Sequence, residues 1–240
     1  MSLDRIPFIL TAALANHVSM TPPTPPPAAA EIAKEVSSGE RLFSKTVRVL
    51  PALSKIIIWV SSLCEMSAIL ADKYPDNPLA VKILRALTWG STQSVSRIGI
   101  TSTFIVGWGL VIAGGIFRWR CYCALGRLFT FEITLRPGHR LVTSGPYSVV
   151  RHPSYTALIV GGIGIAICLA SPGSWVRESG VLDTTWGRVF AYGWSAWTVY
   201  LATMCWMRTP QEDRMLRKQF GKEWEAWAVD VPYRLFPGIF

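Results

Sequence analysis

Long apolar runs separated by shorter polar segments dominate the chain. A membrane-spanning helix needs about 20 largely apolar residues. Four runs come close to or exceed that length: residues 49–71, 98–117, 155–171 and 186–207. The third run is the shortest, and its Gly161, Gly162 and Gly164 allow close packing against another helix. This pattern predicts an all-α, polytopic integral membrane protein built as a helical bundle.

A fifth apolar run, residues 6–20, is shorter and has the length of a signal-peptide core. However, Asp4 offsets the charge of Arg5, and no clear small-residue cleavage site follows. We interpret residues 6–20 as a retained first span, which raises the expected number of transmembrane helices to about five. The Pro-rich segment at residues 21–27 then ends the helix and forms a stiff linker.

A further apolar patch at residues 79–89 contains Lys82 and Arg85, so it favours an interfacial helix over another span. With five spans, the loops at residues 21–48, 118–152 and 208–240 lie on one side of the membrane and contain 16 Lys and Arg residues. The loops on the other side contain 7. Because basic loops stay in the cytosol, the C-terminus is expected to be cytosolic.

Composition supports this membrane assignment. Half of the residues are hydrophobic and 16% are charged, against roughly 25% charged residues in a soluble domain. A disordered chain is excluded as well, because it needs low hydrophobicity. The net charge of +9 beside long apolar runs indicates basic cytosolic loops rather than a nucleic-acid-binding protein. Five cysteines form no disulfide framework, and the Cys121-x-Cys123 spacing is too short for a zinc site, so no metal is expected.

We divide the chain into an N-terminal region of membrane spans, residues 1–97, and a core at residues 98–240. Ionisable residues gather in two stretches of the core, at residues 125–155 and 208–240, both on the expected cytosolic side. Each stretch adjoins the last pair of spans, so we expect the two to meet and form a pocket. Taken singly, their motifs also fit a turn, a lipid-phosphate anchor or a helix-surface ion pair. Their joint occurrence on one face favours a functional site.

Three motifs in these stretches are distinctive. They are Leu141-Val-Thr-Ser-Gly-Pro-Tyr, Arg151-His-Pro-Ser-Tyr155 and Arg208-x-x-x-Glu212. Together they resemble the isoprenylcysteine carboxyl methyltransferase family over roughly residues 98–240. The short first span followed by the Pro-rich segment is similar to fungal members. The resemblance implies an endoplasmic-reticulum membrane enzyme that uses S-adenosylmethionine to methylate the C-terminal carboxylate of a prenylated cysteine in CaaX-processed proteins.

The resemblance also implies roles for individual residues. Arg208 is implied to face the substrate and act in catalysis, and Glu132 falls where animal members have Gln. The implied cofactor-binding residues are Glu132, His139, Arg140, Leu141, Val142, Tyr147, His152, Pro153, Ser154, Tyr155 and Glu212.

These residue types suit methyl transfer to a carboxylate. A C-terminal carboxylate has an ordinary pKa of about 3.3–3.7 and is already ionised at neutral pH, so no general base is required. A planar guanidinium such as that of Arg208 can hold a carboxylate through two hydrogen bonds. Three alternatives remain open: a phospholipid N-methyltransferase, an NADPH-dependent sterol reductase with a similar C-terminal region, and a membrane scaffold without catalytic activity.

Overall fold

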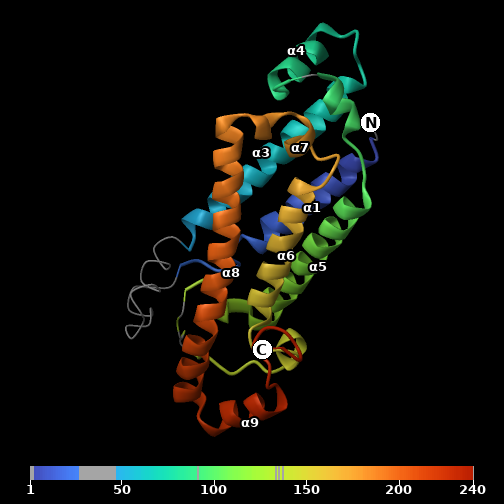
Figure 1. Cartoon of the computed structure of the whole chain (residues 1–240). Helices are drawn as coiled ribbons and strands as arrows, with labels where there is room; N and C mark the ends of the chain where they lie inside the picture. Colours follow the sequence, from blue (N-terminus) through green and yellow to red (C-terminus); the bar gives the residue numbers. More distant parts are fainter. Residues whose placement is uncertain are drawn as a thin grey trace. The chain divides into compact units, whose positions relative to one another are not determined.

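The computed structural model describes residues 3–26, 47–90, 92–132, 134, 136 and 138–239. These residues form helices joined by turns and loops, as the sequence predicted (Figure 1). The α-helices are α1 (Arg5–Ser19), α3 (Val49–Asp72), α4 (Pro78–Leu87), α5 (Ser102–Leu125), α6 (Pro153–Ala170), α7 (Trp175–Glu178), α8 (Thr185–Phe220) and α9 (Lys222–Asp230). Short 3-10 helices lie at η1 (Thr92–Arg97), η2 (Gly126–Leu128), η3 (Gly145–Ser148) and η4 (Val181–Asp183).

Among the described residues, three helical stretches are long and apolar enough to cross a membrane, so the protein is a multi-pass membrane protein. They are Val49–Asp72, Ser102–Leu128 and Pro153–Glu178, and they match three of the predicted spans. The other two predicted spans coincide with α1 and with the first part of α8. The 15 residues of α1 extend about 22 Å at 1.5 Å per residue, which is less than the ~30 Å hydrocarbon core. That α1 and α8 also cross the membrane stays a prediction.

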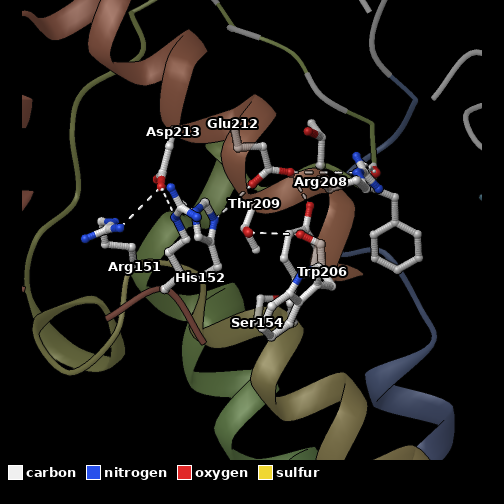
Figure 2. Close-up of polar contacts among 12 residues, drawn as sticks. Arg151, His152, Ser154, Trp206, Arg208, Thr209, Glu212 and Asp213 are labelled. Carbon is white, nitrogen blue, oxygen red and sulfur yellow. Dashed lines mark hydrogen bonds and ion pairs between the residues drawn. The ribbon is translucent and has the colours of Figure 1, made fainter. Parts of the chain in front are cut away.

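The α8 helix continues well beyond the predicted apolar run, which ends at residue 207. It has 36 residues and passes through Pro210, which lacks the N–H that would bond to the carbonyl oxygen of Trp206. The hydroxyl of Thr209 donates to that oxygen instead, at 3.0 Å (Figure 2). Gly221, with φ of +53°, adopts a conformation that favours glycine and separates α8 from α9. The polar residues that follow position 207 therefore lie on a helix.

The α4 helix has the amphipathic character predicted for residues 79–89. Asn77 caps its first turn by accepting hydrogen bonds from two backbone amides. Leu84 and Leu87 pack against a buried apolar cluster, while Lys82 and Arg85 are exposed. This arrangement fits a helix with one buried and one polar face; its location at a membrane surface stays a prediction.

The chain forms two compact units, and each combines segments that are far apart in sequence. Unit 1 consists of Met1–His17, Lys55–Ala113 and Val160–Tyr200. Unit 2 consists of Val18–Ser54, Gly114–Ile159 and Leu201–Phe240. The predicted Pro-rich linker is non-helical over residues 21–26, and its last residue lies outside the described residues. The division into regions 1–97 and 98–240 stays a prediction.

Close helix packing in unit 1 depends on two glycines. A Cβ atom added at Gly164 of α6 would lie 2.7 Å from the carbonyl oxygen of Gly107 in α5. A Cβ atom at Gly107 would lie 2.9 Å from the carbonyl oxygen of Gly164. The predicted close packing is therefore confirmed at Gly164, whereas a Cβ at Gly161 would meet open space. The two backbones approach each other where neither residue has a side chain.

Unit 1 also contains a buried ion pair. The Arg5 guanidinium, 1% exposed, donates to the carboxylate of Glu65 and to the carbonyl oxygen of Gly99. It lies 3.7 Å from the centre of the Phe104 ring. A buried charge needs such partners, because an unpaired one loses its hydration without compensation. These contacts join the start of α1 to α3 and to the segment before α5.

Candidate active site

A cavity lies within unit 2. Its walls come from the end of α5, the loop before α6, the start of α6, the part of α8 that follows residue 207, and α9. The lining residues are Leu125, Leu128, Phe129, Thr130, Glu132, Thr134, His139, Arg140, Leu141, Val142, Tyr147, Arg151, His152, Ser154, Tyr155, Glu212, Met215, Leu216 and Trp227.

All the residues predicted to hold a cofactor line this cavity, with the exception of Pro153. Pro153 is fully buried as the first residue of α6, where a proline is favourable because the first N–H of a helix has no partner within it. Arg208, predicted to act in catalysis, is 3% exposed and is not a lining residue. The structure therefore gathers residues that lie as far apart in sequence as Glu132 and Glu212.

The imidazole of His152 lies between two consecutive carboxylates of α8 (Figure 2). Its Nε2 is 2.9 Å from Oδ1 of Asp213, and its Nδ1 is 3.3 Å from Oε2 of Glu212. Both nitrogens of the ring thus face a hydrogen-bond acceptor. Such a pair of partners satisfies the doubly protonated, positively charged form of histidine.

The pKa values of these three groups shift in a consistent way. Burial opposes a charge on His152, but hydrogen bonds to Asp213 and Glu212 and their negative charges outweigh it and raise its pKa. Burial alone would raise the pKa of Glu212, yet the hydrogen bond from His152 and the charges of His152 and Arg208 lower it. The pKa of Asp213 is lowered in the same way, against burial, by His152, Arg151 and Arg234. All three groups are therefore charged in a common pH range.

The other oxygen of Glu212 has its own partners. The Tyr155 hydroxyl donates to Oε1 of Glu212, and Nε of Arg208 lies 3.8 Å from the same atom. Arg208 also donates from Nη2 to the carbonyl oxygen of Phe131 at 2.8 Å, and its guanidinium lies 5.7 Å from the centre of the Tyr155 ring. These contacts on both oxygens fix the orientation of the Glu212 carboxylate at the cavity wall.

A second carboxylate of the cavity, Glu132, pairs with a residue far away in sequence. Arg48, directly before α3, donates from Nε and Nη2 to the two oxygens of Glu132 at 2.7 and 3.1 Å. This two-pronged contact is the strongest geometry available to an Arg–carboxylate pair. Arg48 does not stand out in the sequence, because it lies among other basic residues of the loop at 21–48.

The two polar stretches contact each other, as the sequence predicted. The backbone amides of Arg151 and His152 donate to the carbonyl oxygens of Tyr233 and Arg234 at 3.0 and 2.8 Å. The indole of Trp227, in α9, donates to the carbonyl oxygen of Tyr147. The C-terminal segment is therefore part of the structure that surrounds the cavity.

Arg118 of α5 forms hydrogen bonds with the start of α6. Its Nη1 donates to the backbone oxygen and the hydroxyl of Ser154 at 2.8 and 2.7 Å, and its Nε donates to the carbonyl oxygen of Ser19. The guanidinium also lies within 6 Å of the ring centres of Tyr122 and Phe129, a cation–π arrangement. In the sequence, Arg118 is one of the basic residues of the loop at 118–152, and that pattern does not reveal that it is buried.

His139 contributes a buried polar atom for which the described part of the chain offers no hydrogen-bond partner. Its Nδ1 is buried and has no hydrogen-bond partner among the residues that the structure describes. Burial lowers its pKa, which favours the neutral ring. Because His139 lines the cavity, this nitrogen suits a hydrogen bond to a bound polar molecule.

Part of the chain is similar to known proteins. Residues 107–177 match the Isoprenylcysteine carboxyl methyltransferase (ICMT) family. The chain is 29% identical to protein-S-isoprenylcysteine O-methyltransferase B of Arabidopsis thaliana over 140 residues. These matched residues make up 58% of this chain and 57% of the relative. This chain is 30% identical over 128 residues to a probable protein-S-isoprenylcysteine O-methyltransferase of Oryza sativa subsp. japonica, covering 52% and 57%. The chain thus spans a little over half the length of these relatives.

A weaker similarity connects the chain to sterol reductases. It is 29% identical to 7-dehydrocholesterol reductase of Danio rerio over 101 residues, and the matched residues make up 42% of this chain but 17% of that protein. No solved structure matches the chain. The similarity to fungal methyltransferases suggested by the N-terminal pattern finds no support in the plant relatives and stays a prediction.

Proposed function

We propose that this protein is a membrane methyltransferase that uses S-adenosylmethionine to methylate the C-terminal carboxylate of a prenylated cysteine. The observation that carries the proposal is the single cavity lined by residues of the three distinctive motifs. The matched family region, residues 107–177, contains the loop that supplies most of that lining. The names of the plant relatives point to the same substrate class.

The side chains of the cavity fit the cofactor. S-adenosylmethionine is an amphiphilic cation with an adenine ring, hydroxyl groups, an amino group and a carboxylate. Glu212 and Glu132 offer acceptors and negative charge, His139 offers its unbonded Nδ1, and Tyr147 and Trp227 offer apolar ring surface. When bound, S-adenosylmethionine supplies the methyl group that is transferred to the substrate carboxylate.

The protein residues in this proposal bind and orient rather than transfer protons. The nucleophile is a carboxylate that is ionised at neutral pH, so the tasks are alignment of the reactants and removal of water. We assign the cofactor to the cavity side chains and to the Glu212 carboxylate in particular. We assign alignment of the substrate carboxylate to Arg208, whose guanidinium has the required planar donors.

We further propose a five-span topology in the endoplasmic reticulum with a cytosolic C-terminus. The hydrogen bonds of residues 151–152 to residues 233–234 support the proposal that the loop and the C-terminal segment lie on the same side of the membrane. The α6 helix between them is long and apolar enough to cross once. A return crossing is then needed, and α8 provides the apolar residues 186–207 for it.

A similar argument supports α1 as a span. Arg5, at its start, donates to the carbonyl oxygen of Gly99, directly before α5. Ser19, at its end, accepts a hydrogen bond from Arg118, near the end of α5. Because the two ends of α1 are bonded to the two ends of α5, a crossing by α5 implies a crossing by α1.

Incubation of membranes that contain the protein with labelled S-adenosylmethionine and N-acetyl-S-farnesylcysteine tests the proposed function. We expect a base-labile methyl ester, absent from membranes without the protein. Methylated phosphatidylethanolamine would instead indicate a phospholipid N-methyltransferase. Reduction of a sterol with oxidation of NADPH would indicate a reductase, the class to which the Danio rerio relative belongs by name. Binding without any turnover would favour a scaffold.

A further inference from the structure

We propose that Asp213 is a positioning residue of the cavity: it holds the His152 ring, which in turn fixes the Glu212 carboxylate toward the bound cofactor. The inference rests on the proposed function for the identity of that cofactor. Asp213 is 5% exposed and does not line the cavity. It acts through a second residue, and neither sequence motif nor family resemblance assigned it a role.

Asp213, His152 and Glu212 form a chain of contacts (Figure 2). His152 and Glu212 line the cavity, whereas Asp213 does not. Oδ1 of Asp213 meets Nε2 of His152 at 2.9 Å, and Nδ1 of the same ring meets Oε2 of Glu212 at 3.3 Å. The contact at Nε2 therefore influences whether Nδ1 carries a proton and how the ring is oriented toward Glu212. The Tyr155 ring stacks on the imidazole, with ring centres 5.9 Å apart and an interplanar angle of 14°, so the ring has little freedom to rotate.

Asp213 divides its two oxygens between two tasks. Oδ1 contacts His152, while Oδ2 accepts from Nε of Arg234 at 2.9 Å and from Nη2 of Arg151 at 3.4 Å. Arg234 belongs to the C-terminal segment, so a second role for Asp213 is to fasten that segment. The two roles separate experimentally, because Arg234 can be replaced without removing a contact of His152.

The charge state of His152 depends on every group that faces it. On α8 these are the carboxylates of Glu212 and Asp213 and, beyond them, the guanidinium of Arg208. Arg151 precedes His152, Arg234 approaches from the C-terminal segment, and the uncharged Tyr155 stacks from α6. The two carboxylates make direct contact with the ring, and the arginines contact the carboxylates. Removal of the Asp213 charge therefore weakens the protonated form of His152.

The first experiment titrates the imidazoles by NMR in detergent micelles. The chain has three histidines, and His152→Gln assigns the signal of interest by its absence. In the unsubstituted protein we expect His152 to titrate above the ordinary histidine pKa. In Asp213→Asn, which keeps an oxygen acceptor but removes the charge, we expect its pKa to fall; in the control Arg234→Gln we expect it to stay above the ordinary value.

The second experiment measures the affinity for S-adenosylmethionine as a function of pH in the same proteins. In Asp213→Asn, deprotonation at Nδ1 places a lone pair against Glu212, so we expect affinity to fall roughly tenfold as pH rises through the lowered His152 pKa. The unsubstituted protein and Arg234→Gln should show no such fall in that range. Asp213→Glu, which restores the charge, should recover part of the affinity.

Three results would overturn the inference. One is a His152 in the unsubstituted protein that titrates at or below the ordinary value, a result that needs no variant to fold. Another is an unchanged His152 pKa in Asp213→Asn. The third is identical behaviour of Asp213→Asn and Arg234→Gln, which would leave Asp213 with only the fastening of the C-terminal segment. Failure of the unsubstituted protein to bind S-adenosylmethionine would reject the proposed function, while the imidazole titration would still decide whether Asp213 controls His152.

Discussion

Glu212 contacts three charged or polar side chains at the cavity wall, and its truncation tests the cofactor site. His152 contacts one of its oxygens, and Tyr155 and Arg208 contact the other. We expect Glu212→Ala to weaken S-adenosylmethionine binding more than substrate binding. A hydrogen bond to a charged group contributes roughly 1.5–3 kcal/mol, which corresponds to about tenfold to over a hundredfold in the dissociation constant.

Equilibrium binding of S-adenosylmethionine and the KM for N-acetyl-S-farnesylcysteine measure the two effects of Glu212→Ala separately. Gln211→Ala is the matched control, because Gln211 precedes Glu212 on α8 but does not line the cavity. An unchanged dissociation constant in Glu212→Ala would speak against its assignment to the cofactor.

Arg208 makes contacts that depend on the shape of its guanidinium. Nη2 donates to the carbonyl oxygen of Phe131, while Nε faces Glu212. We expect Arg208→Lys to lower turnover steeply and to leave S-adenosylmethionine binding near normal, because lysine keeps the charge but loses the planar donors that align a carboxylate. Turnover under saturating cofactor, together with the dissociation constant, checks this.

The control for Arg208 is Arg214→Lys, an exposed arginine on the same helix. Near-full activity of a folded Arg208→Lys protein would reject a role in alignment. Arg208 would then be a structural residue that joins α8 to the segment at Phe131.

The charged cluster at His152 also makes stability depend on pH. Because the pKa of His152 is raised by folding, the native state binds this proton more tightly than the unfolded state does. The resulting stabilisation of the native state is complete below about pH 6.5 and is lost as pH rises through the native pKa. The lowered pKa values of Glu212 and Asp213 act at the acid end, where stability is lost as pH falls through them. Stability from this cluster is therefore largest in mildly acidic solution.

Thermal unfolding in detergent at a series of pH values tests this dependence. The melting temperature of the unsubstituted protein should fall as pH rises above 6.5. In His152→Gln this fall should be smaller, because the contribution of His152 is missing. Identical slopes in the two proteins would mean that the ring does not change its proton affinity on folding.

The individual site residues that could be predicted from the sequence are those that belong to distinctive motifs. The Arg-His-Pro-Ser-Tyr155 run and Glu212 belong to distinctive motifs, and apart from Pro153 these residues line the cavity. Asp213, Arg48 and Arg118 lie among other charged residues in the sequence. The importance of Asp213 and Arg118 follows from their burial, and that of Arg48 from its contact with Glu132, a partner far away in sequence. A single sequence contains no record of such pairings.

Among the helices, α5 and α6 provide the sharpest test of packing. A Cβ at Gly164 would lie 2.7 Å from the Gly107 carbonyl oxygen and from the Val111 backbone nitrogen. Backbone atoms cannot yield as a side chain can, so we expect Gly164→Ala to destabilise the protein by roughly 1–3 kcal/mol, the usual cost of overpacking.

Gly161→Ala is the matched control for this substitution. It lies one turn earlier on α6, where a Cβ meets open space. Alanine has the higher helix propensity, by up to about 1 kcal/mol, so this variant should be neutral or more stable. Thermal unfolding of the two variants in the same detergent gives the comparison, and equal stabilities would show that α5 and α6 are not in backbone contact at Gly164.

The helices themselves were largely predictable, because apolar runs of membrane length leave few alternatives. The boundary that was least predictable is the end of α8. A proline in a polar segment normally ends a helix, yet α8 continues for ten residues beyond Pro210. The hydroxyl of Thr209 bonds to the carbonyl oxygen that lost its donor, and buried partners of Asp213 hold the following turn. Such tertiary contacts cannot be deduced from helix propensity.

At the scale of the whole molecule, the proposed topology makes a prediction that separates five spans from three. If α1 and α8 both cross the membrane, the segment between α6 and α8 lies on the lumenal side and the segment after α8 is cytosolic. If α8 does not cross, both segments lie on the same side. Hydrogen bonds between the loop before α6 and the C-terminal segment favour the first arrangement, as does the 16-to-7 distribution of Lys and Arg between the two sides.

Glycosylation acceptor sites placed in these segments distinguish the two arrangements. A site inserted within residues 179–184 should be glycosylated, and a site appended after residue 240 should not. A site appended before residue 3 should be glycosylated too, because five spans place the N-terminus opposite the C-terminus. Glycosylation after residue 240 would put the cavity on the lumenal side, away from the cytosolic cofactor. It would therefore contradict both the topology and the access route on which the proposed methyl transfer depends.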